Sequence, residues 1–241
     1  MSLLTMIQDV ALSIGLINET SDLTSVIGNT DPTVNQLLAL GNKEGKDLRK
    51  RTDWQALTKE VTFLTTNTNL QGTLVSIAGA GYGHIISNTL WDRTHSRPIR
   101  GSISNQRWAA LEGATADGTY SEHQIRDKSL YAIPAPGSAT ATWAFFYYSK
   151  YWCQDSGGTG QERWAADDDT GILDEDLMAL GIEWRYLKAK GFDYSEEFNT
   201  YERQVQEDIL HDRDHPVINL ETSRIGGPGV LGFPEGSWPA P

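Results

Sequence analysis

The spacing of apolar residues changes twice along the chain, and this change most limits the possible fold. Residues 3–14 and 174–209 place apolar side chains three or four positions apart, which is the spacing of a helical face. Asp31-Pro32 predicts a further helix start, with Asp as the N-cap and Pro at the first helical position. Residues 55–150 instead carry short β-branched and aromatic runs between turns, such as 141–149. The chain therefore predicts an α+β protein.

The predicted architecture is a helical bundle built from N- and C-terminal helices, with a small antiparallel β-barrel or sandwich inserted. The expected boundaries are 1–54 and 170–215 for the helical domain, and 55–169 for the β insert with its loops. Residues 216–241 form an extended C-terminal tail in this interpretation, because Pro and Gly recur there. Gly41 and Gly45 fall on a buried helical stripe, which predicts the close approach of another backbone.

The C-terminal tail carries more apolar residues than a solvated segment needs. We expect these residues to bind a partner or a neighbouring subunit. They are Val217, Ile218, Leu220, Val230, Leu231, Phe233 and Trp238.

The net charge of −12 is concentrated in one part of the chain. Residues 154–214 carry 6 basic and 17 acidic side chains, including Asp167, Asp168 and Asp169. An acidic surface repels phosphate, which disfavours nucleic-acid binding by counterion release. Two interpretations remain: a solvated helical face, or a surface that avoids a polyanion or meets a basic partner.

The sequence contains no catalytic or ligand-binding motif that identifies a site. Cys153 is the only cysteine, so neither an intrachain disulfide nor a Cys-based zinc site is expected. His211 and His215 have the spacing of helical metal ligands, but Pro216 favours a charge cluster at a helix end. No metal, cofactor or catalytic residue is therefore predicted, and no apolar run is long enough to span a membrane. The eight Trp residues favour large cores and protein interfaces.

The expected order of elements is two helices, a β insert, two helices and a tail. This order and several local motifs resemble the head-to-tail adaptor proteins of tailed phages, including the tail tubular protein A type of short-tailed phages. The likeness covers about residues 1–215, and residues 125–137 are its most characteristic stretch. The motifs are Asp31-Pro32-Thr33-Val34, Asp53-Trp54, Trp91-Asp92-Arg93, Arg97-Pro98-Ile99, Trp108, residues 125–137, Tyr147-Tyr148-Ser149 and residues 170–177.

The resemblance implies a structural virion protein in the neck or tail, present in the host cytoplasm during assembly. It would form a ring of about twelve copies on the portal protein and contact a tail or nozzle protein. Genomic DNA would pass through without specific binding, and we expect Asp167, Asp168 and Asp169 to line that channel. The apolar tail residues would bind the portal or a neighbouring subunit. The alternatives are another phage tail or baseplate component, or a glycan hydrolase that uses carboxylates of the β domain.

Overall fold

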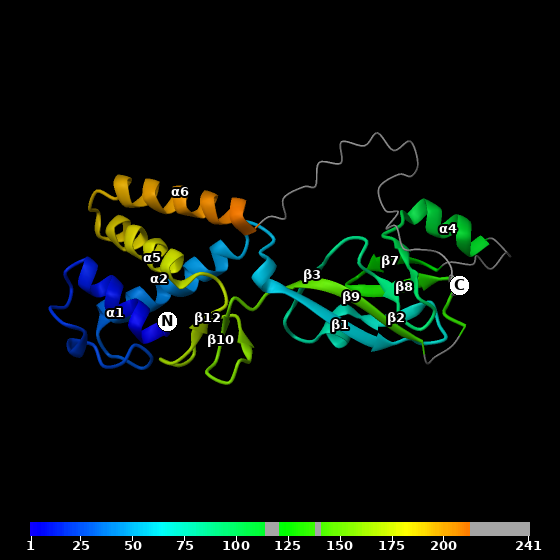
Figure 1. Ribbon diagram of the computed structural model, residues 1–241, viewed down its shortest axis with the longest axis horizontal. Coiled ribbons are helices and arrows are strands. Elements are labelled where there is room, and N and C mark those ends of the chain that lie inside the picture. The colour runs from blue at the N-terminus through cyan, green and yellow to red at the C-terminus, as the bar shows by residue number, and fades with distance from the viewer. Residues whose placement is uncertain (114–120, 138–140, 213–241) are drawn as a thin grey trace, which may run out of the picture.

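The computed structural model describes residues 1–113, 121–137 and 141–212, which form two halves arranged end to end (Figure 1). The helical half comprises residues 1–57 and 150–212, and the β half comprises residues 58–149. Each half has its own hydrophobic core. The mixed α+β class is therefore as predicted.

Local capping signals set the starts of three of the four long helices and the end of one. The Ser2 side chain caps the first helix, and the Asp31 carboxylate accepts a hydrogen bond from the Thr33 amide at 2.7 Å. Asp174 caps the third of these helices, and Gly191 ends it at a φ of 79°. The helices are α1 (Leu3–Ser13), α2 (Pro32–Leu48), α5 (Glu175–Lys190) and α6 (Ser195–Asp212), with single turns η1 (Thr20–Asp22) and η2 (Gln55–Leu57).

The glycines of α2 face side chains rather than another backbone, which corrects the expectation. A Cβ at Gly45 would lie 2.3 Å from the ring of Trp152, and one at Gly41 would lie 3.2 Å from Ile182 Cδ1. Trp152 is fully buried, and its ring meets that of Trp164 edge-on at a centroid distance of 5.1 Å. The glycines therefore make room for a tryptophan pair in the core of the helical half.

Residues 152–173 belong to the helical half, although residues up to 169 were expected in the β insert. Trp152, Cys153 and Trp164 lie in the helical core. Three short antiparallel strands form a sheet in the order β11-β10-β12. They are β10 (Cys153–Gln154), β11 (Gly160–Gln161) and β12 (Thr170–Gly171). The insert thus ends near residue 149, because burial against the helices outweighs the loop-like local composition.

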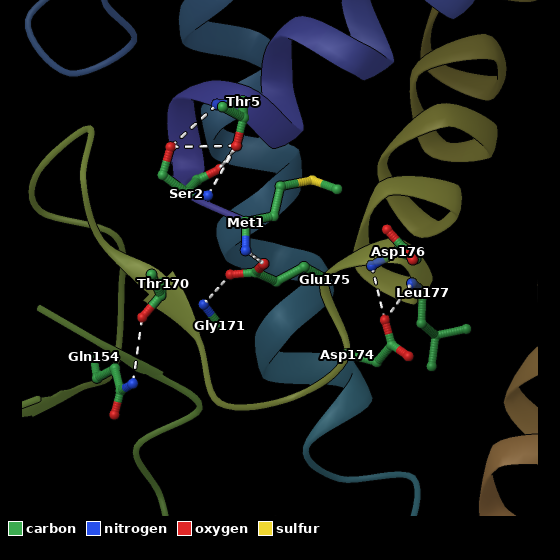
Figure 2. A network of polar contacts seen from close by, with 10 residues as sticks. All are labelled: Met1, Ser2, Thr5, Gln154, Thr170, Gly171, Asp174, Glu175, Asp176 and Leu177. Atoms are coloured by element: carbon green, nitrogen blue, oxygen red, sulfur yellow. Dashed lines mark hydrogen bonds and ion pairs between the residues drawn. The ribbon is translucent and has the colours of Figure 1, made fainter. Parts of the chain in front are cut away.

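Polar contacts attach this small sheet to the start of α1 and of α5 (Figure 2). The Glu175 carboxylate pairs with the Met1 amino group at 2.5 Å and accepts the Gly171 amide at 2.5 Å. Ser2 forms a β-bridge with Thr170. The start of the chain therefore meets the distant stretch 170–175 at one point.

A buried ion pair joins the long helices. Glu44 on α2 is fully buried, and its carboxylate accepts from Arg185 Nε on α5 at 2.5 Å. The Tyr201 hydroxyl on α6 donates to the same carboxylate, and Arg185 also reaches Asp47 at 3.0 Å. A buried carboxylate needs such partners to offset its lost hydration.

The β half contains two sheets around one shared core. The larger sheet has the order β1-β9-β4-β5, with β3 also pairing with β9; the smaller has the order β2-β8-β7-β6. The strands are β1 (Thr58–Leu64), β2 (Leu70–Thr73), β3 (Tyr82–Ile85), β4 (Trp91–Asp92), β5 (Arg97–Pro98), β6 (Arg100–Gly101), β7 (Glu122–Arg126), β8 (Ser129–Ile133) and β9 (Thr142–Ser149). The helices are α3 (Leu74–Ala78) and α4 (Asn105–Gly113). Within the described ranges neither sheet closes on itself, so the expected barrel is not found.

Most of the tryptophans serve the two cores. Six of the seven described Trp residues are buried, and Trp91 is half-buried. Their abundance therefore reflects core packing more than the subunit contacts that the sequence suggested. None of the helices in the described part of the chain combines the length and the apolar composition that crossing a bilayer requires.

Candidate functional site at the junction of the two halves

The two halves are joined by two chain segments that lie next to each other. Strands β1 and β9 pair along seven residues, and the β1 start and β9 end both lead into the helical half. Tyr151 lies at this junction against two glycines, because a Cβ at Gly81 or at Gly160 would lie 2.6 Å from its ring. Arg49, which directly follows α2, donates to the Lys150 carbonyl at 2.8 Å. The junction is thus fixed by close backbone approach on both sides.

A cleft of about 1750 Å³ opens beside this junction. It lies between the end of α2, η2, β3, the end of β9 and the end of α6. We call it the junction cleft. Its lining includes Arg49, Lys50, Asp53, Trp54, Gln55, Tyr82, His84, Tyr148, Lys150, Glu162, Leu210, His211 and Asp212.

A histidine–carboxylate pair crosses the junction cleft. His84 Nε2 of the β half lies 3.1 Å from Asp53 Oδ1 of the helical half, and both side chains are about 60% exposed. The His84 ring packs on that of Tyr148 at a centroid distance of 5.0 Å. Burial and then the charge of Asp53 raise the pKa of the Tyr148 hydroxyl. The His84–Asp53 pair is open to water, so solvent screens its charges and the pair adds little to stability.

Two further contacts hold the cleft walls. The Gln55 backbone amide and side-chain amide donate to the Asp212 carboxylate and carbonyl at 2.8 and 2.5 Å, which attaches the end of α6 to η2. Lys150 Nζ pairs with Glu162 at 2.5 Å. The cleft lining thus carries charges of both signs.

The cleft presents no assembled catalytic group. Ser149 lines it, but its side chain is buried, donating to the Gly81 carbonyl at 3.3 Å and accepting from the Tyr151 amide at 3.1 Å. This hydroxyl is therefore not aimed at His84 as a nucleophile would be. Across residues 1–113, 121–137 and 141–212, no three His, Cys, Asp or Glu side chains gather in a way that could hold a metal ion.

The three aspartates predicted to line a channel have separate roles. Asp167 Oδ1 accepts from the Val26 and Ile27 amides at 3.0 and 2.7 Å. Asp169 is fully buried and accepts from the Ala165 and Ala166 amides at 2.6 and 2.9 Å. A buried carboxylate presents no charge to a lumen, so the prediction is wrong for Asp169. Only Asp168 is exposed.

The other predicted site residues lie outside the described residues. These are the apolar tail positions Val217, Ile218, Leu220, Val230, Leu231, Phe233 and Trp238, and also His215. His211, the other half of the considered metal pair, lines the junction cleft.

The carboxylates of the β half bear on the hydrolase alternative. Burial raises the pKa of Asp92, but hydrogen bonds from His95 and Arg97 outweigh burial and leave that pKa below its ordinary value. The Arg107 guanidinium lowers the pKa of Glu122. A general acid for glycoside hydrolysis needs a raised pKa, so neither group is tuned for that role.

Sequence reasoning missed the junction cleft. Its lining comes from five segments, and nothing in the local pattern of any one of them marks it. The glycine-rich stretch 79–83 runs into β3, and its Gly81 packs against the Tyr151 ring at the junction.

Neither the models of known protein families nor the curated proteins contain a match to this chain.

Proposed function

We propose that this protein is a structural virion protein that connects head to tail in a tailed phage. In this role it docks as a ring on the portal protein and continues the DNA channel into the tail. The proposal rests on the motifs of the resemblance together with the shape of the molecule. The shared core of two open sheets supports the sandwich form of the insert over the barrel.

The observation that carries the proposal is the end-to-end arrangement of two separately packed halves (Figure 1). N- and C-terminal helices form one half, and the inserted β half projects from it on two adjacent strands. Each half offers its own surface, so one can contact the portal while the other contacts a tail or nozzle protein. A connector needs two such separate binding surfaces.

The charge distribution supports passage of DNA without binding. Residues 1–57 and 150–212 carry 11 basic and 23 acidic side chains, whereas residues 58–149 carry 7 and 6. An acidic helical half facing the channel repels the phosphates of DNA. Of the three aspartates first considered for the channel, Asp168 is the one that stays a candidate.

The portal complex tests the proposal directly. Purified protein is mixed with portal rings, and the mass of the complex is measured by light scattering after size exclusion. A complex that gains about twelve copies is expected for a ring matched to the portal. A test variant replaces Leu231 and Phe233 with Ser in the full chain, and portal binding should weaken if the C-terminal tail contacts the portal. A protein without portal affinity would refute the connector role.

Two other functions make different predictions in the same experiment. Another tail or baseplate component would form multimers that ignore the portal. A hydrolase would act as a monomer on glycans, and the lowered pKa values of Asp92 and Glu122 disfavour it.

A further inference from the structure

The described part of the chain ends within the lining of the junction cleft. Leu210, His211 and Asp212, the last residues of α6, form one side of the cleft, and α6 ends beside the junction in Figure 1. The Asp212 carboxylate and carbonyl accept hydrogen bonds from the two amides of Gln55, at 2.8 and 2.5 Å. Residues 213–241 follow directly, so the C-terminal segment begins at a fixed point in the cleft.

A proline explains why α6 stops at this point. In a continuing helix, the Asp212 carbonyl would accept a hydrogen bond from the amide of residue 216, but Pro216 has no amide hydrogen. The side-chain amide of Gln55 donates to that carbonyl instead. Pro216 thus disfavours an extension of α6 away from the junction.

Apolar side chains of both halves line the cleft and are not fully covered. Leu210 is 62% exposed, whereas Ile209 beside it is buried in the helical core. Tyr82, Ile86 and Tyr148 of the β half are half-buried. Covering such side chains removes apolar surface from water, so the cleft favours an occupant that carries apolar groups.

The volume and the charge of the cleft favour a peptide over a small ion or metabolite. The cleft volume of about 1750 Å³ exceeds the roughly 300–1,000 Å³ of pockets that hold small ligands. Three Lys or Arg side chains and three Asp or Glu side chains line the cleft, so its lining has little net charge. An occupant with apolar side chains and balanced charge fits these properties.

The residues that follow Asp212 have this composition. Residues 213–220 contain one Arg and one Asp, and then Val217, Ile218 and Leu220. Five residues span at most about 18 Å, so Val217 lies within that distance of Asp212. A segment tethered this closely has an effective concentration of millimolar order, which a separate molecule would have to exceed. The chain's own C-terminal segment is therefore the occupant that the cleft favours.

We propose that Val217 and Ile218 bind in the junction cleft of their own chain and cover Leu210. The bound segment contacts both halves, because the cleft lies between the end of α6 and β3. Of the apolar tail positions, Val217 and Ile218 thereby serve the chain itself, and Leu231 and Phe233 stay available to the portal. This inference does not depend on the connector role.

Hydrogen exchange of the full-length protein, followed by mass spectrometry, tests the proposal. Ile218→Ser removes an apolar contact from the segment, and Leu210→Gln removes one from the cleft wall while keeping helix propensity. Loss of one buried aliphatic side chain weakens binding about tenfold. Each variant should therefore raise the exchange rate of the amides in residues 53–57 and 82–86, which line the cleft, by up to about tenfold.

Two matched controls accompany these variants. Phe192→Gln replaces another side chain that is 62% exposed but lies outside the cleft lining, and Val230→Ser replaces an apolar residue further along the C-terminal segment. Both controls should exchange as the wild type does. Amides of α1, which does not line the cleft, should exchange at the same rate in all four variants, and this confirms that the fold is intact.

The other outcomes overturn the proposal. Unchanged exchange in either Ile218→Ser or Leu210→Gln shows that these two side chains do not meet in the cleft. Faster exchange in Val230→Ser, with none in Ile218→Ser, assigns the cleft to a more distal part of the segment. Protection that grows with protein concentration assigns it to the segment of a second copy. The connector role survives each of these results, because the mass of the portal complex tests it separately.

Discussion

Replacing Gly45 with Ala should destabilise the helical half, although Ala is the better helix former. In a helix interior this substitution gains about 1 kcal/mol of stability. The new Cβ would lie 2.3, 2.4 and 2.5 Å from three ring atoms of Trp152. That ring has no room to withdraw, because it is fully buried and its Nε1 donates to the Glu162 carbonyl at 2.9 Å. Overpacking of this kind costs about 1–3 kcal/mol, so after the gain in helix propensity we expect a net loss of up to about 2 kcal/mol.

Gly41→Ala provides the matched control on the same helix. Both positions are buried and lie one turn apart, so the gain in helix propensity is the same. The nearest atom to a Cβ at Gly41 is the terminal methyl group of Ile182, at 3.2 Å. A flexible methyl group can move by a few tenths of an ångström. We therefore expect Gly41→Ala to be neutral or to stabilise by up to about 1 kcal/mol.

Urea unfolding followed by circular dichroism at 222 nm measures both variants. This signal reports mainly the helical half, which is appropriate because two separate cores need not unfold together. The unfolding midpoint of Gly45→Ala should fall while the slope stays constant. If Gly45→Ala proves as stable as Gly41→Ala, then the ring of Trp152 does not occupy this space and the reasoning fails.

Three further predictions concern other buried groups. Tyr201→Phe removes a hydrogen bond to the buried Glu44 carboxylate and should lower the free energy of unfolding by about 1.5–3 kcal/mol. The same urea titration measures this loss, and an unchanged unfolding midpoint would contradict the contact. The pKa of Glu122 is lowered by Arg107, so its contribution to stability is complete above the ordinary value of 4.5 and is lost as the pH falls through the lower folded-state value. Glu122→Gln should therefore flatten the acid side of a profile of melting temperature against pH, and a parallel profile would refute this. Burial raises the pKa of Cys153 to about 12, so a thiol reagent at pH 8 should react only in urea, whereas rapid reaction of the folded protein would show that the thiol is accessible.

Local signals in the sequence determined most of the elements. Asp31-Pro32 starts α2 as predicted, and α5 begins after its N-cap Asp174 and ends at the left-handed Gly191. The β7–β8 hairpin likewise turns at Asp127 and Lys128, which are both at positive φ. These features depend only on contacts within a few residues. They can therefore be predicted from the sequence alone.

The tertiary structure alone decided how the elements combine. The loop-like stretch around Trp164 joined the helical core, because its partner Trp152 and the glycine that accommodates that ring lie far away in the sequence. Asp169 is buried although its neighbours in the sequence indicate a solvated turn. Its carboxylate accepts from nearby amides, but its backbone carbonyl accepts from the distant Leu3 amide at 2.8 Å. The junction cleft arises only when distant segments pack. A local sequence pattern indicates which conformation a residue favours. Whether its side chain is buried depends on which distant part of the chain packs against it.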